Sequence, residues 1–313
     1  MLQLPGKLSA LLFHFFLGFA LCFLVPTASA QTAAVNNTTT INWFQAVILG
    51  IVQGITEFLP ISSSAHLKVV PVALGWGDPG ITFTAVIHLG SIAAIILYFR
   101  KELSQLIQGT FQALQEKDYH NNDLRLTVGI LLGTIPILIC GLLWKLFVTD
   151  NSPLRSMTTI AITSIVIALL LGIAEWLGKR DRDEKQLKPI DAILMGIAQC
   201  LALIPGTSRS GITITAGLFM GLERPTAARF ALLMGIPTIV IAGLVELTDV
   251  FEQGWNNAEI MPLLIGTLTT FIFSYLAVVG LIRYLQKQNT WVFVWYRVIF
   301  GLLIILGVLT NQF

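Results

Sequence analysis

The stretch QGITEFLPISSSAHL, residues 53–67, interrupts an apolar segment with a carboxylate, a proline, three consecutive serines and a histidine. Apolar residues dominate on both sides of the proline, over 43–59 and 61–76. Each half is near or below the roughly 17 residues that a helix needs to cross a bilayer. A broken apolar segment is tolerated in a membrane only where its backbone faces protein or a water-filled cavity. We therefore expect a re-entrant helical hairpin with these polar residues at its tip.

The composition is that of a multi-span membrane protein. Apolar residues make up 55% of the 313 residues, charged residues make up 12%, and the mean hydropathy is +0.79. In soluble domains about a quarter of the residues are charged. The formal charge of +2 gives no sign of a nucleic-acid partner. We expect an all-α integral membrane protein with six transmembrane helices, in the segments 81–99, 126–148, 157–177, 228–248, 260–282 and 291–311.

Residues 1–30 have the features of a secretory signal peptide. Lys7 precedes an apolar core over 9–25, and TASAQ supplies an Ala-x-Ala-type cleavage site at the end of this stretch. The core is long for a signal, so an uncleaved first span is the alternative. We expect residues 31–42 to form a polar leader and residues 43–313 to form a single membrane domain.

A second broken segment resembles the first. Apolar residues over 190–204 and 208–222 flank the stretch PGTSRSG, residues 205–211. Gly-Ile-x-Gln precedes both breaks, and aligning Gln53 with Gln199 requires one gap to bring the two prolines together. We expect this pair to be a second re-entrant hairpin.

Three predicted spans follow each broken segment, which indicates an internal duplication with repeat one over 43–178 and repeat two over 190–313. An odd number of spans per copy forces the copies into opposite orientations, an inverted-topology plan that places the binding site where the hairpin tips meet. Lysine and arginine are dense in 179–188 and absent from 249–259, and these residues favour the cytoplasmic side. We therefore expect the first hairpin to open outward and the second to open inward.

The residues at the two breaks suit a phosphate ligand. Glu57 lies one turn after Gln53 and could bind a divalent metal or move a proton. Arg209 offers a planar fork for phosphate oxygens, and Gly206 beside it allows the backbone to approach a ligand closely. The N-termini of half-helices present free N–H groups to an anion. Hydroxyl groups that could complete the cradle or attack phosphorus belong to Ser62, Ser63, Ser64, Thr207, Ser208, Ser210 and Thr213.

Several of these polar residues also have structural interpretations. Serines in membrane helices often bond to carbonyls or pack against other helices. We interpret His88 as a structural histidine without polar neighbours, and Arg297 as a residue near a span end that snorkels to the interface. The physical pattern alone also fits a lipid-phosphate flippase or an ion-coupled membrane transporter, because inverted repeats with paired hairpins are a transporter plan.

QGITEFLPISSSAH and PGTSRSG together resemble the two signature regions of the bacterial undecaprenyl-diphosphatase family of the bacitracin-resistance type. The resemblance covers residues 41–313. It implies a plasma-membrane enzyme, open to the outer face, that hydrolyses undecaprenyl diphosphate to undecaprenyl phosphate and inorganic phosphate. It also implies recycling of the lipid carrier for cell-wall synthesis and a divalent cation, magnesium or calcium. The implied partners are a polyprenyl diphosphate lipid and the bilayer, and a homodimer is left open.

The resemblance also suggests roles for single residues. We expect Arg209 to hold the terminal phosphoryl group and Ser63 to be the nucleophile, with Glu57 as metal ligand or base. His66 is the second candidate for base or nucleophile, and direct attack by water is not separated from a phosphoserine intermediate. Gln53 stands where the family often has glutamate, so this motif supplies one carboxylate for a metal and not two. The expected substrate-binding residues are Gln53, Ser62, Ser64, Gly206, Thr207, Ser208, Ser210 and Thr213.

Overall fold

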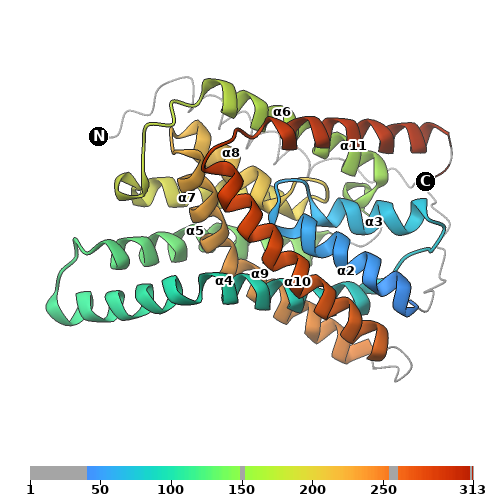
Figure 1. Cartoon of the computed structure of the whole chain (residues 1–313), viewed down its shortest axis with the longest axis horizontal. Helices are drawn as coiled ribbons and strands as arrows, with labels where there is room; N and C mark the ends of the chain where they lie inside the picture. The colour runs from blue at the N-terminus through green and yellow to red at the C-terminus, as the bar shows by residue number, and fades with distance from the viewer. Residues whose placement is uncertain (1–40, 149–151, 254–259, 311, 313) are drawn as a thin grey trace.

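The structure is a computed structural model that describes residues 41–148, 152–253, 260–310 and 312. All the secondary-structure elements within these residues are helices (Figure 1). The expected signal peptide and all but the last two residues of the expected leader lie outside the described residues.

Within the described part of the chain, six helices are long and apolar enough to cross a membrane. This confirms the expected all-α architecture and makes the protein a multi-pass integral membrane protein. The six are α4 (Gly80–Glu116), α5 (Asn122–Phe147), α6 (Met157–Leu177), α9 (Arg224–Gln253), α10 (Ile260–Leu285) and α11 (Trp291–Leu309).

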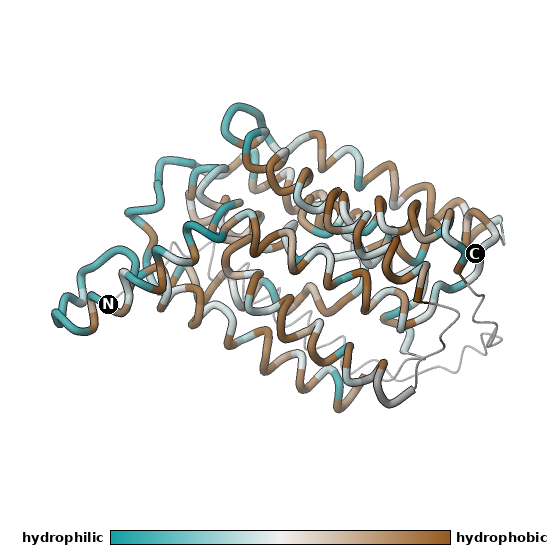
Figure 2. The backbone as a smooth tube through the Cα atoms, turned by 60° about the horizontal axis from the view of Figure 1, so that its bottom comes forward, coloured by the Kyte–Doolittle hydropathy of each residue, from teal (hydrophilic) through white to brown (hydrophobic). Residues whose placement is uncertain are grey.

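Helix α4 extends well beyond the apolar segment that predicted it. Its 37 residues correspond to about 55 Å at 1.5 Å per residue, against roughly 30 Å for a hydrocarbon core. The part after Phe99 is rich in Gln, Leu and Glu, which favour helix in water as well as in lipid. It forms the protruding hairpin with α5 at the left of Figure 1, and the same end of the molecule is hydrophilic in Figure 2.

Short helices occur in two pairs, one at each break. α2 packs against α10 and α7 packs against α5, so each pair lies against a long helix from the other half of the chain. The breaks confirm the interrupted segments, whereas re-entry into the membrane stays a prediction. The short elements are α2 (Trp43–Phe58), α3 (Ser63–Ala73), α7 (Pro189–Gln199), η3 (Cys200–Leu203) and α8 (Arg209–Phe219), with η1 (Pro153–Arg155) and η2 (Glu184–Gln186) in connections.

Small residues let α10 approach α2 and α4 closely. A Cβ atom on Gly54 would lie 2.9 Å from the backbone nitrogen of Ser274, so only glycine fits at this crossing. Ser274 Oγ lies 2.9 Å from Ser91 Oγ of α4, and Thr270 Oγ1 donates to Gly50 O at 3.2 Å. This packing holds the end of α2, where the first break begins, beside α4.

Candidate active site

Backbone turns of similar shape lie at the two breaks. α3 and α8 each begin directly after a serine in the left-handed region, Ser62 with φ 77° and Ser208 with φ 68°. Such angles are uncommon for residues other than glycine, and the strain persists only where the surroundings hold it. Gln53 and Gln199 are both completely buried, and within the described chain neither Oε1 atom has a hydrogen-bond partner. An internal duplication would produce matching turns and matching buried glutamines of this kind. The duplication itself stays a prediction.

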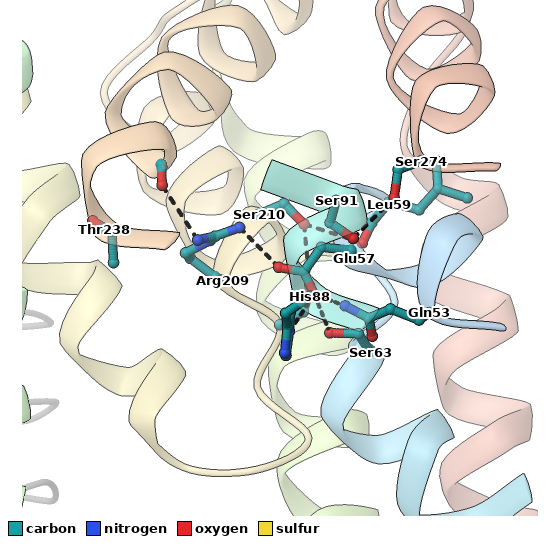
Figure 3. Close-up of polar contacts among 12 residues, drawn as sticks. Gln53, Glu57, Leu59, Ser63, His88, Ser91, Arg209, Ser210, Thr238 and Ser274 are labelled. Carbon is teal, nitrogen blue, oxygen red and sulfur yellow. Dashed lines mark hydrogen bonds and ion pairs between the residues drawn. The ribbon is translucent and has the colours of Figure 1, made fainter. Parts of the chain in front are cut away.

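The carboxylate of Glu57, in the last turn of α2, is the centre of a polar cluster (Figure 3). Ser63 Oγ donates to Glu57 Oε2 at 2.6 Å, and Gln53 Nε2 donates to the same oxygen at 3.1 Å. Arg209 Nη2 donates to Oε1 at 3.0 Å. Ser63 is the first residue of α3 and Arg209 is the first residue of α8. The structure therefore brings three of the predicted site residues, from both breaks, to the carboxylate of a fourth.

Two further contacts join the breaks to each other. Ser210 Oγ donates to Leu59 O at 3.0 Å, and the backbone nitrogen of Gly206 donates to Ser64 Oγ at 3.4 Å. Ser62 Oγ lies 3.2 Å from Ser64 Oγ. These predicted binding residues therefore line the contact between the breaks, next to the Glu57 cluster.

The remaining predicted hydroxyls are engaged elsewhere. Ser208 Oγ accepts from the backbone nitrogen of Gly211 at 3.1 Å and so caps α8. Thr213 is completely buried, and its Oγ1 donates to Arg209 O at 2.8 Å inside its own helix. Thr207 is also buried. We therefore describe Thr213 as a packing residue in this arrangement and not as a member of the cluster.

His66 occupies a separate position behind the first break. Its Nδ1 atom lies 2.7 Å from Ser62 O, and its Nε2 atom lies 2.7 Å from the hydroxyl of Tyr296. A carbonyl oxygen only accepts, so Nδ1 carries a proton. The ring stacks on Phe300 with centroids 4.1 Å apart. Both ring nitrogens are thus occupied, and none of these partners is the carboxylate of Glu57.

His88 has two polar neighbours that the sequence did not reveal. Its Nε2 atom lies 3.4 Å from Glu57 Oε2, and its Nδ1 atom lies 3.3 Å from Glu246 Oε2. The interpretation of His88 as a histidine without polar neighbours is therefore wrong. The sequence gives no signal for this contact, because it joins α4 to α2 and α9, far apart along the chain.

Arg297 does not snorkel, so that expectation is wrong too. Its side chain is completely buried within α11, and it donates to backbone carbonyls of both breaks. One sequence feature could have indicated this: Arg297 lies nearly two turns inside the last apolar segment, too deep for an interfacial residue.

The cluster offers a partial set of ligands for a divalent cation. The described residues contain no group of three His, Cys, Asp or Glu side chains arranged for a metal. Glu57 supplies one carboxylate, and the buried Oε1 atom of Gln53 lacks a partner within the described chain. Magnesium is commonly held by one or two carboxylates together with substrate phosphates and water. These oxygen atoms fit a hard cation whose remaining ligands would be water or the phosphate oxygens of a bound ligand.

Known proteins resemble the chain over most of its length. A family model described as bacitracin resistance protein BacA matches residues 46–303. A protein of Trichormus variabilis named undecaprenyl-diphosphatase is 57% identical over 277 residues, which is 87% of each chain. Proteins of the same name from Synechocystis sp. and Synechococcus elongatus are 55% and 57% identical, covering 90% and 89% of this chain and 87% and 97% of their own. The resemblance inferred from the two motifs is confirmed, and the chain belongs to the BacA family of bacitracin resistance proteins.

Proposed function

We propose that this protein hydrolyses undecaprenyl diphosphate to undecaprenyl phosphate and inorganic phosphate. Relatives that are more than half identical carry the name undecaprenyl-diphosphatase. The observation in the structure that supports this activity most is the Glu57 carboxylate between the hydroxyl of Ser63 and the guanidinium of Arg209. A hydroxyl, a proton acceptor and a phosphate-binding cation within hydrogen-bond reach are the parts that phosphoryl transfer needs.

Ser63 is our candidate for the nucleophile. Its hydroxyl donates to Glu57 Oε2 at 2.6 Å, so the carboxylate can take the proton when the oxygen attacks the terminal phosphorus. The bond between that phosphorus and the bridging oxygen breaks, and the bridging oxygen leaves as part of undecaprenyl phosphate. Water then releases the phosphoryl group from serine as inorganic phosphate. Direct attack by a water activated by Glu57 would give the same products.

Arg209 and the start of α3 would hold the charge that moves during the reaction. The Arg209 fork uses Nη2 on Glu57 and Nη1 on Gly235 O at 3.3 Å, which fixes its plane. Ser62 makes no side-chain cap on α3, so the first N–H groups of this helix can bind an anion. Groups fixed in this way stabilise phosphoryl oxygens without having to reorganise.

Glu57 and the Oε1 atom of Gln53 would hold the divalent cation, magnesium or calcium. When bound, this ion would offset the negative charge of the diphosphate.

The cellular setting follows from the same proposal. Six apolar helices place the protein in a membrane, and we infer the plasma (inner) membrane with the site open to the outer face. There the reaction would recycle the lipid carrier for cell-wall synthesis. A flippase or transporter function, compatible with the sequence pattern, would not require the hydroxyl, carboxylate and guanidinium of the cluster to be in contact.

The test is phosphate release by protein purified in detergent, with farnesyl diphosphate and undecaprenyl diphosphate as substrates. We expect release by the wild type that stops on chelation of divalent cations and is lost in Arg209→Ala. Arg100→Ala is the matched control, because among the described residues Arg100 bonds to Leu97 O of its own helix and to none of the cluster. A wild type without phosphatase activity, or an Arg209→Ala protein as active as the wild type, would contradict the proposal.

A further inference from the structure

The guanidinium of Arg297 binds backbone carbonyls of both breaks. Its Nη2 atom donates to Gly206 O at 2.7 Å and to Thr207 O at 2.9 Å, and its Nη1 atom donates to Pro60 O at 3.4 Å. The first two carbonyls precede α8, and the third precedes α3. One side chain from α11 therefore connects the two turns that carry the cluster.

This arginine is placed where a positive charge is costly. Its side chain is 0% exposed, and no carboxylate of the described residues lies within ion-pair distance of it. A buried ion without a partner of opposite charge is unfavourable, so its bonds to carbonyls must offset much of this cost. A Cβ atom at position 211 would lie 2.8 Å from Arg297 Nη1, so Gly211 provides the space that the guanidinium occupies. The two breaks and α11 are shaped around this group.

The bonded carbonyls lie beside the strained backbone of each break. Pro60 O is two residues before Ser62, and Thr207 O immediately precedes Ser208, the two serines with positive φ. Such conformations persist only when neighbouring contacts hold them. Arg297 supplies one of these contacts on each side, and its hydrogen-bond partners are backbone carbonyls and not the side chains of Glu57 or Ser63.

We propose that Arg297 is a positioning residue that fixes the two breaks relative to each other, and thereby sets Ser63 against Glu57 and Arg209. This inference rests on the proposed function. A guanidinium is needed because its planar fork spans carbonyls of two separate turns, whereas a lysine ammonium is a single point of charge. Displacing a reacting group by about 1 Å can lower turnover about 100-fold.

Arg297→Ala and Arg297→Lys test the proposal, with Arg182→Ala as the matched control. Arg182 also joins separate segments through carbonyls, donating to Met220 O and Gln186 O, and it pairs with Asp191 away from the cluster. We expect Arg297→Ala to lower kcat for farnesyl diphosphate by about 100-fold, with free guanidinium restoring at least about a tenth of the lost activity. Arg297→Lys is expected to fold and to have a lower kcat than the wild type. Arg182→Ala is expected to lower the unfolding temperature and to keep kcat within about threefold of the wild type in the folded fraction, without guanidinium rescue.

Hydrogen exchange supplies a readout that does not depend on activity. In Arg297→Ala we expect faster amide exchange in peptides covering 59–66 and 204–210 together, with α6 unchanged. A folded Arg297→Ala protein with normal kcat, or faster exchange at neither break, would overturn the proposal. If Arg297→Ala does not fold, a folded Arg297→Lys protein with normal kcat would overturn it instead. A wild type that releases no phosphate, with exchange altered at both breaks, would refute the proposed function and leave the positioning role standing.

Discussion

The two oxygens of Glu57 have different partners, and this asymmetry suggests different roles. Oε2 accepts hydrogen bonds from the hydroxyl of Ser63 and the amide of Gln53, whereas Oε1 accepts one from Arg209. The oxygen beside the hydroxyl is the one placed to accept its proton. The other oxygen holds the guanidinium in its plane, so that its remaining N–H groups can face a phosphate.

Ser63→Ala removes this hydroxyl and very little volume. If Ser63 is the nucleophile, we expect phosphate release to fall by on the order of 10³-fold or more, while the apparent unfolding temperature stays near that of the wild type. Ser104→Ala is the matched control, because Ser104 is exposed on α4 and its hydroxyl accepts from Gln108 of the same helix, away from both breaks. Near-normal turnover in Ser63→Ala would end the nucleophile assignment and favour a water activated by Glu57.

Arg209→Lys keeps the charge and loses the fork. A lysine can contact Glu57 or a phosphate oxygen, but it cannot hold two phosphate oxygens in one plane. We expect the variant to fold and to lose about 2–4 kcal/mol of transition-state stabilisation, measured from kcat/KM. Full activity in Arg209→Lys would reduce Arg209 to a general counter-charge.

The breaks between helices depend on backbone conformation as much as on side chains. Gly206 has φ +91°, and a Cβ atom there would lie 2.6 Å from Ile160 O of α6. Gly75 has φ +68°, but nothing lies within 4 Å of its Cβ position. A substitution at Gly75 therefore tests conformational strain alone, whereas a substitution at Gly206 tests conformational strain together with steric overlap.

We expect Gly75→Ala to cost about 1–2 kcal/mol, the strain of a left-handed residue. Gly206→Ala should cost at least about 2 kcal/mol more, because the carbonyl of Ile160 would have to move. Chemical denaturation in detergent, followed by tryptophan fluorescence, measures both. Equal losses in the two variants would show that α6 yields easily and that the second break is not tightly held.

The two breaks could be predicted from the sequence more fully than the contacts between distant helices. The broken segments and their polar tips were predictable, because the apolar halves were too short to span and polar residues were concentrated at the breaks. The contacts of His88 and Arg297 were not, because each joins helices that are distant along the chain. The end of α4 was also missed, since hydropathy locates the lipid boundary, whereas the helix continues on its own propensity to Glu116.

Beyond the two breaks, a buried carboxylate ties three helices at one end of the molecule. Glu175 of α6 accepts from Arg224 at the start of α9, and from the hydroxyl and backbone nitrogen of Thr290 before α11. We expect Glu175→Gln to lower the free energy of unfolding by about 3 kcal/mol, because it leaves Arg224 and Arg180 without their shared charge partner. kcat in the folded fraction should stay near wild type. A loss of kcat with unchanged stability would connect this end to the reaction and contradict our assignment.

The orientation of the whole protein in the membrane is a separate prediction. We expect the connection between α3 and α4 to face outward and the basic segment 179–188 to face the cytoplasm, because lysine and arginine favour that side. Gly75→Cys and Lys185→Cys, introduced into a variant without the native cysteines, test this with an impermeant maleimide on intact cells. Position 75 should react, and position 185 should react only after permeabilisation. The reverse pattern would overturn the proposed outward-facing site.

The central claim is that the residues around Glu57 direct attack at the terminal phosphorus of a prenyl diphosphate. Hydrolysis of undecaprenyl diphosphate by the purified wild type in H₂¹⁸O, with mass analysis of both products, tests it most directly. Attack through Ser63 or by water at the terminal phosphorus predicts one ¹⁸O atom in the inorganic phosphate and none in undecaprenyl phosphate. Label in the lipid product, or no hydrolysis at all, would contradict the account.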